Sequence, residues 1–147
     1  MNDSDAASGE DLVLALGAAW SALERAVNAG LGSIRGISLA EYRLLRALAD
    51  APRSRSSRVE LARAVGLTPS AVTRALRPLE DLGFIATVKN ERDARLALAM
   101  LTPAGEELVA DASSVVRDTM SQVLRRAPQV RDGRQGLLTM LGELAQS

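Results

Sequence analysis

The residues best suited to binding chemistry in this 147-residue chain lie on one face of a helix that we predict from Pro69 onward. Polar side chains recur on that face at helical spacing, at Ser70, Thr73, Arg74 and Arg77. Apolar side chains recur on the nearly opposite face, at Val72, Ala75, Leu76 and Leu79. Arginine can bond guanine through two hydrogen bonds, while serine and threonine can bond base edges or phosphates. The pattern indicates a helix that reads the major groove of DNA, with a merely solvated face as the alternative.

A second candidate is the loop NERDAR, residues 90–95, between strand-like segments at 85–89 and 96–101. Arginines at a hairpin tip can enter a minor groove or contact phosphates. Asp93 stands between two of them and would weaken phosphate binding unless it holds one guanidinium in place. We therefore interpret one of Arg92 and Arg95 as the DNA contact and the other as the partner that Asp93 braces, and count both arginines as candidate DNA-binding residues.

These side chains need helices that hold them against DNA. Two capping boxes, Ser38–Glu41 and Ser57–Glu60, predict where two such helices begin. The first helix should run to about Asp50 and be followed by a loop over residues 51–56. The second is short, and Gly66 is well placed to end it in a left-handed conformation.

The polar-faced helix then begins cleanly, with Thr68 as its cap and Pro69 in its first position. Pro78 lacks a backbone donor and should kink or end the regular part of this helix. Two short helices joined by a glycine-containing turn form a helix-turn-helix. The hairpin beside it would be the wing.

Amphipathic helices are predicted at both ends of the chain. From about Glu10 to Ala29 the apolar spacing is helical, at Val13, Leu16, Trp20, Leu23 and Val27. Asn28–Gly30 and Gly32 should break that helix. Further helices are expected from Thr102–Pro103 to Arg126 and, after a break over 128–133, across Leu137–Leu144. The predicted fold is mainly α with a small β-hairpin: a winged helix-turn-helix flanked by N- and C-terminal helices.

Composition narrows the function classes. The net charge is zero, yet residues 53–95 carry nine basic and five acidic side chains, a local surplus of +4 that favours phosphate binding. The chain has no cysteine and no histidine, so we expect no disulfide, thiol sensor, metal site or cofactor, and an enzyme is the weakest interpretation. No membrane span or basic leader is visible, so a cytoplasmic protein is expected.

The segments LARAVGLTPSAVTRALRPLEDLGFI, NERDAR and LTPAGEEL resemble the MarR family of bacterial transcriptional regulators. The likeness extends over roughly residues 10–145. The family's wing commonly reads D-x-R-D-R-R, and this chain keeps Arg92, Asp93 and Arg95. Asn90 replaces the first acid and Ala94 replaces an arginine. By this resemblance Arg92 would reach the minor groove.

The resemblance implies one MarR-like chain over residues 1–147 that forms a homodimer. Residues 10–30 and 102–146 would form the dimerisation helices, and residues 38–101 the part that binds double-stranded DNA. The implied function is a repressor of a pseudo-palindromic operator, released by a small-molecule effector. Trp20 and Tyr42 are candidates to line the effector pocket, with core packing as the alternative. A winged-helix protein-interaction module without DNA binding is the alternative function.

Overall fold

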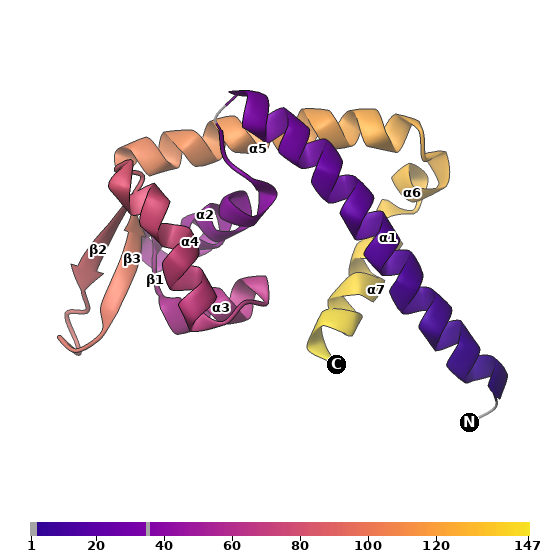
Figure 1. Cartoon of the computed structure of the whole chain (residues 1–147), viewed down its shortest axis with the longest axis horizontal. Helices are drawn as coiled ribbons and strands as arrows, with labels where there is room; N and C mark the ends of the chain where they lie inside the picture. Colours follow the sequence, from indigo (N-terminus) through magenta and orange to yellow (C-terminus); the bar gives the residue numbers. More distant parts are fainter. Residues whose placement is uncertain (1–2, 35) are drawn as a thin grey trace.

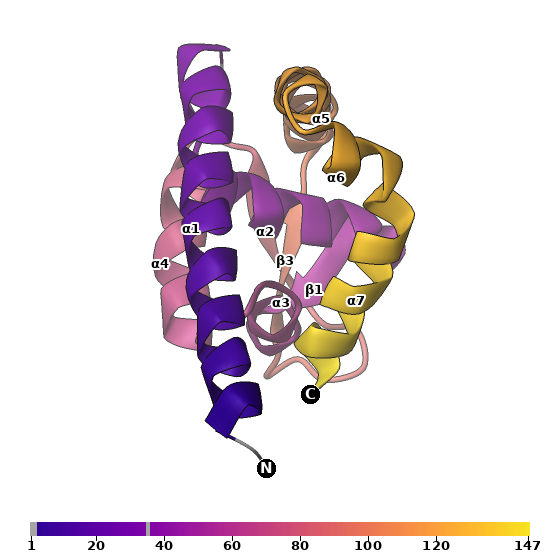
Figure 2. The same ribbon diagram turned by 90° about the vertical axis from the view of Figure 1, so that its right-hand side faces the viewer.

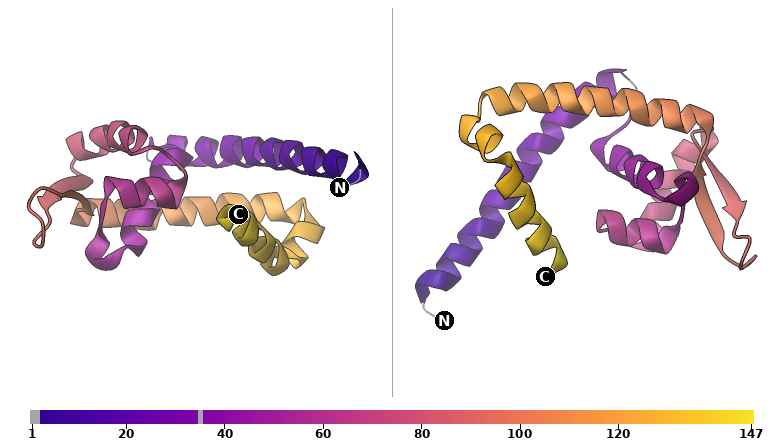
Figure 3. Two further views of the ribbon diagram at one scale, coloured as in Figure 1. Left: turned by 90° about the horizontal axis from the view of Figure 1, so that it is seen from below. Right: turned by 180° about the vertical axis from the view of Figure 1, so that it is seen from behind.

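A long central helix joins the two parts of the molecule. The computed structural model describes residues 3–34 and 36–147. Helix α5 (Pro103–Arg125) runs from the winged part at one end to the terminal helices at the other, and both chain ends lie on the side away from the wing (Figures 1 and 3). The remaining helices are α1 (Asp3–Ile34), α2 (Leu39–Asp50), α3 (Arg58–Val65), α4 (Pro69–Asp81), α6 (Pro128–Asp132) and α7 (Arg134–Gln146).

The wing belongs to a small antiparallel sheet with the strand order β1-β3-β2, in which β2 and β3 form the wing hairpin. Its strands are β1 (Arg55–Ser57), β2 (Ile85–Lys89) and β3 (Ala97–Leu101). The hairpin register pairs Ile85 with Leu101 and Lys89 with Ala97. The short strand β1 adds to the other edge of β3, where Ser56 faces Ala99. The mainly helical winged fold expected from the sequence is confirmed.

Leucine side chains dominate the core beneath the wing and the helix-turn-helix. Helix α2 lies at its centre, because its buried face packs against α3, α4, α5 and the sheet. Among the described residues, no helix has the length and apolar character needed to cross a membrane. The largest fully buried side chains are Leu31, Leu44, Leu45, Leu48, Leu61, Leu76, Leu79 and Leu108.

The predicted helix caps are confirmed. Ser38 and Glu41 form a reciprocal capping box at the start of α2, and Ser57 and Glu60 form another at the start of α3. Gly66 ends α3 with φ of 69°, in the left-handed region. The loop between α3 and α4 therefore has the sharp turn that a helix-turn-helix requires.

The predicted break at Asn28–Gly30 and Gly32 is wrong, because α1 continues to Ile34. Glycine costs a helix about 1 kcal/mol relative to alanine, so another interaction must compensate. A Cβ atom at Gly30 would lie only 3.0 Å from Thr119 Oγ1 and 3.1 Å from Val115 Cγ1 on α5. Gly30 thus permits the close crossing of α1 over α5, and the packing maintains the helix.

Three further boundaries differ from the sequence prediction. Helix α4 continues past Pro78 to Asp81, since the proline ring lies on the exposed face and Leu79 beside it is buried. Residues 51–56 hold a 3-10 turn (Pro52–Ser54) and the start of β1 rather than a loop alone. Residues 128–133 contain the one-turn helix α6, which begins with a proline in its first position.

Candidate nucleic-acid interface

The predicted reading face lies on the outside of α4. Each of its side chains is exposed, whereas Val72, Leu76 and Leu79 on the opposite face are at most 1% exposed. The Thr73 hydroxyl donates to the backbone carbonyl of Pro69 at 3.0 Å, which leaves its oxygen lone pairs to accept a hydrogen bond. The four predicted side chains come together on this face: Ser70, Thr73, Arg74 and Arg77.

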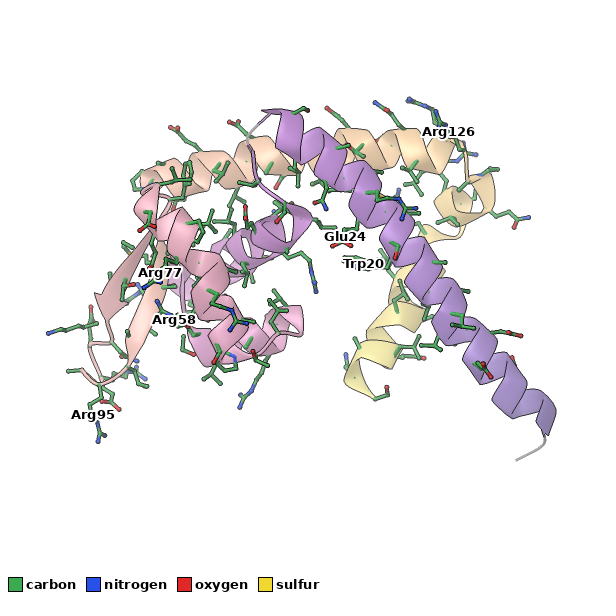
Figure 4. All side chains as sticks on the ribbon, in the orientation of Figure 1. Trp20, Glu24, Arg58, Arg77, Arg95 and Arg126 are labelled. Atoms are coloured by element: carbon green, nitrogen blue, oxygen red, sulfur yellow. The ribbon has the colours of Figure 1, made fainter. Side chains whose placement is uncertain are left out.

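A polar cluster that sequence reasoning missed ties α4 to its neighbours. Glu80 Oε1 accepts hydrogen bonds from Thr87 Oγ1 on β2 at 2.6 Å and from Arg58 Nη2 on α3 at 3.3 Å. The cluster therefore links the first helix of the helix-turn-helix, the reading helix and the wing; Figure 4 shows Arg58 beside α4. In the sequence, Arg58 was only one of the basic residues in the local charge surplus. Its partner, Glu80, is 22 residues away, so no local sequence pattern indicates the pair.

The wing tip contains the ion pair that its sequence suggests. Arg95 Nε lies 3.2 Å from Asp93 Oδ1, which also accepts the backbone N–H of Arg95 at 3.1 Å. The Arg95 side chain is 92% exposed and projects from the tip (Figure 4). The Arg92 side chain has no hydrogen-bonding or ionic partner among the described residues. Contact of either arginine with DNA stays a prediction.

The turn before β1 and the first residue of β1 add two arginines, Arg53 and Arg55, that the sequence did not single out. Arg53 and Ser54 adopt φ of 56° and 54°, a left-handed conformation that costs residues other than glycine of order 1–3 kcal/mol each. The Nε–H of Arg55 is buried and donates no hydrogen bond within the described structure. An unsatisfied buried donor costs about 1–3 kcal/mol. The strained backbone and the unpaired donor therefore both lower the stability of the segment beside the wing.

Trp20 and Tyr42, the predicted effector-pocket residues, lie in different surroundings. Tyr42 lines a cavity of about 630 Å³ between α2, β1 and α3, and its hydroxyl lies 2.9 Å from Ser113 Oγ. Trp20 points from α1 toward the winged part (Figure 4) and is not among that cavity's lining residues. Arg43 connects the two regions: its guanidinium carbon lies 5.4 Å from the centre of the Trp20 ring, and Nη2 donates to the Val65 carbonyl at 3.1 Å.

Most basic side chains between residues 53 and 95 form no ion pair within the described part of the protein, so they are available to an anionic partner. Glu80 neutralises Arg58, and Asp93 neutralises Arg95. The backbone hydrogen bond from Ser57, followed by that from the Ser56 hydroxyl, lowers the pKa of Glu60, so this carboxylate stays ionised at the start of α3. Among the described residues, the basic side chains of the segment without an ion pair are Arg53, Arg55, Arg63, Arg74, Arg77, Lys89 and Arg92.

Comparison with known proteins now identifies the fold. A sequence model of the MarR family matches residues 35–96. The HTH-type transcriptional repressor Rv2887 of Mycobacterium tuberculosis is 38% identical over 118 residues, which cover 79% of this chain and 82% of that protein. The chain belongs to the MarR family. It is a DNA-binding regulator of transcription with a winged helix-turn-helix.

Solved MarR-type structures have the same architecture. That of Rv2887 in complex with p-aminosalicylic acid gives a TM-score of 0.71 at 35% identity, covering 89% of this chain and 98% of that one. The regulator BldR from Sulfolobus solfataricus gives a TM-score of 0.81 at 24% identity, covering 97% and 99% of the two chains. At that identity, BldR supports the fold alone. These comparisons confirm the resemblance inferred from the helix-turn-helix and wing motifs.

Proposed function

We propose that this MarR-family chain is a homodimeric repressor whose two α4 helices enter successive major grooves of a pseudo-palindromic operator. The observation that carries the proposal is α4 itself, which buries one face completely and leaves Arg74 and Arg77 free on the other. Two such helices in a symmetric dimer would read half-sites about one helical turn apart. Repression then follows from occupancy of the operator, and we place the protein in the cytoplasm with the chromosome.

An unpartnered apolar surface supports the dimer. Figure 2 shows α1 and α7 as separate arms on the same side of α5. Their apolar side chains line an open groove of about 470 Å³, and several are about half exposed. Soluble monomers rarely leave a continuous apolar surface of this kind uncovered. The groove residues that a second copy would cover are Leu12, Leu16, Leu137, Met140, Leu141 and Leu144.

Light scattering tests the dimer directly. Leu141→Glu places a charge in the groove and should convert the wild-type mass of two chains into that of one. Leu82→Glu is the matched control, because Leu82 is 68% exposed at the end of α4, away from the groove. A Leu141→Glu protein that keeps the mass of two chains would place the interface elsewhere.

Selection of binding sites from random duplex DNA tests the operator. We expect a palindromic consensus, on which Arg74→Ala should lose about 1–3 kcal/mol, mostly at one base position of each half-site. Arg92→Ala should weaken binding while the fold and dimer stay intact. Arg117→Ala on α5 is a control for the loss of a positive charge. If Arg74→Ala and Arg92→Ala both bind as wild type at matched salt, the assignment of the helix face and wing is wrong.

A small aromatic acid is the effector class we propose. Rv2887 has been solved with p-aminosalicylic acid and with salicylic acid. In this chain, the cavity between α2, β1 and α3 offers the Tyr42 ring and Arg43, and Arg43 also bonds the last turn of α3. A bound acid would favour a conformation in which α4 no longer fits its half-site. Salicylate should release wild-type protein from the operator, and Arg43→Gln should need more of it; release that Arg43→Gln leaves unchanged would exclude this cavity.

A further inference from the structure

A second cationic feature lies beside the wing, apart from the α4 face. A pocket of about 270 Å³ opens between the turn before β1 and the wing loop. We call it the β1–wing pocket. Its walls carry three guanidinium groups against one carboxylate, so its formal charge is +2. Its lining residues are Arg53, Arg55, Asn90, Glu91, Arg92 and Leu98.

The three arginines of the pocket outnumber its one carboxylate, Glu91, and are not paired with it. None of Arg53, Arg55 and Arg92 forms an ion pair within the described structure, whereas Arg95 at the same wing is paired with Asp93. The Nε–H of Arg55 is in addition buried and without an acceptor. The pocket is therefore built to accept negative charge.

The backbone places one of these arginines, Arg53, in an energetically costly conformation. Arg53 and Ser54 both have positive φ, at 56° and 54°. Glycine or asparagine would meet a purely structural need for this turn. Strain of this kind is concentrated at sites where a side chain must be presented in a fixed direction. Here, Arg53, the first of the two strained residues, is one of the three cations of the pocket.

The wing loop completes the other wall. The Asn90 side chain accepts the backbone N–H of Arg92 at 2.9 Å, and the Asn90 N–H donates to the Leu96 carbonyl at 3.0 Å. This turn brings the Arg92 side chain to the pocket formed with Arg53 and Arg55, although the two segments lie far apart in the sequence. Asn90, which departs from the family's wing pattern, thus has a definite structural role.

We propose that the β1–wing pocket binds one backbone phosphate of the operator beside the minor groove that the wing follows. Guanidinium groups match the phosphodiester geometry through paired hydrogen bonds. A phosphate contact carries no base information, but it fixes the register and orientation of the protein on the duplex. The pocket would position the wing, while α4 supplies specificity. This inference rests on the proposed function, since it needs a DNA-bound state.

Salt dependence separates this contact from base reading. In Arg55→Gln and in Arg53→Asn, operator affinity should fall about fivefold to tenfold near physiological salt, and the slope of log K against log salt should decrease by about 1. The order of preference among operator variants should not change. Asparagine is chosen at position 53 because it tolerates the left-handed backbone. Arg117→Gln is the control and should keep the wild-type slope.

Because both arginines would contact one phosphate, the double variant should lower the slope by about 1 and not by 2. Neutral methylphosphonates placed singly along the operator would then locate that phosphate. One position should weaken wild-type binding and leave Arg55→Gln unaffected. A wild-type slope in Arg55→Gln, or equal sensitivity of both proteins at every position, overturns the pocket while wild-type operator binding stands. Failure of wild-type protein to bind any duplex overturns the proposed function instead.

Discussion

Replacing Glu80 by alanine should loosen the reading helix from the wing. One carboxylate oxygen of Glu80 accepts from both Thr87 on β2 and Arg58 on α3. No other hydrogen bond or ion pair between described side chains joins these three elements. The mutation therefore removes the polar link that sets the direction of α4 relative to β2, while the buried apolar face of α4 stays in place.

The magnitude follows from the two contacts. The hydrogen bond from Thr87, at 2.6 Å, is worth about 1 kcal/mol net. The ion pair with Arg58 is partly screened, since the two side chains are 23% and 29% exposed, and adds about 0.5 kcal/mol. A loss of about 1.5 kcal/mol should lower the melting temperature by roughly 3–6 °C. If binding must restore the same geometry, operator affinity should fall about tenfold.

The assay compares operator with scrambled duplex at matched salt. Asp81→Ala is the control, because it removes the same charge one residue later from an exposed side chain without a partner in the described structure. Both variants should bind scrambled DNA slightly more tightly, since each makes the net charge of the protein one unit more positive. Only Glu80→Ala should lose preference for the operator. If the two variants show the same preference, the cluster does not position α4.

Three other perturbations address stability and coupling. Gly105→Ala would push a Cβ atom into the backbone carbonyl of Phe84, in the turn before β2, and should lower the free energy of unfolding by about 2 kcal/mol in a thermal melt. Gly9→Ala is the control: space around Gly9 is open, so this variant should lose no stability. The hydrogen bonds that lower the pKa of Glu60 stabilise the folded protein when the pH is above 4.5, the ordinary pKa of this carboxyl group. Urea unfolding at pH 7 should therefore show that wild type is more stable than Glu60→Gln, and this difference should disappear as the pH falls through the pKa of Glu60 in the folded protein. A difference in stability that does not depend on pH would contradict this prediction. Arg43→Gln removes the cation over the only tryptophan, so the fluorescence of Trp20 should change in the free protein; an unchanged spectrum would mean that the contact is absent in solution.

Local chemistry made much of the winged part predictable. The capping boxes at Ser38 and Ser57, and the left-handed Gly66, depend on neighbouring residues and were placed correctly. The role of Gly30 could not be predicted in the same way, because Gly30 is required by the close approach of α5, which is distant in the sequence. The sequence therefore suggested a helix break at a position where α1 continues. The short strand β1 escaped prediction for a similar reason, because its hydrogen bonds come from β3, more than 40 residues later.

The candidate site shows the same division. The two faces of α4 followed from helical period alone, and the ion pair of Asp93 with Arg95 followed from adjacency. The positions of Arg53 and Arg55 at the wing could not be predicted, because they require a strained turn and the partner strand to be known. Arg43, which contacts both α1 and the end of α3, likewise gave no periodic signal.

The most direct test of the account is the salt dependence of binding to duplex DNA. Purified protein is titrated with the selected operator and with a scrambled duplex at several salt concentrations. A repressor that grips DNA with α4 and the wing predicts a strong preference for the operator and a steep fall in affinity as salt rises. Equal, weak and salt-independent binding to both duplexes would contradict it and favour a winged-helix module that binds protein instead.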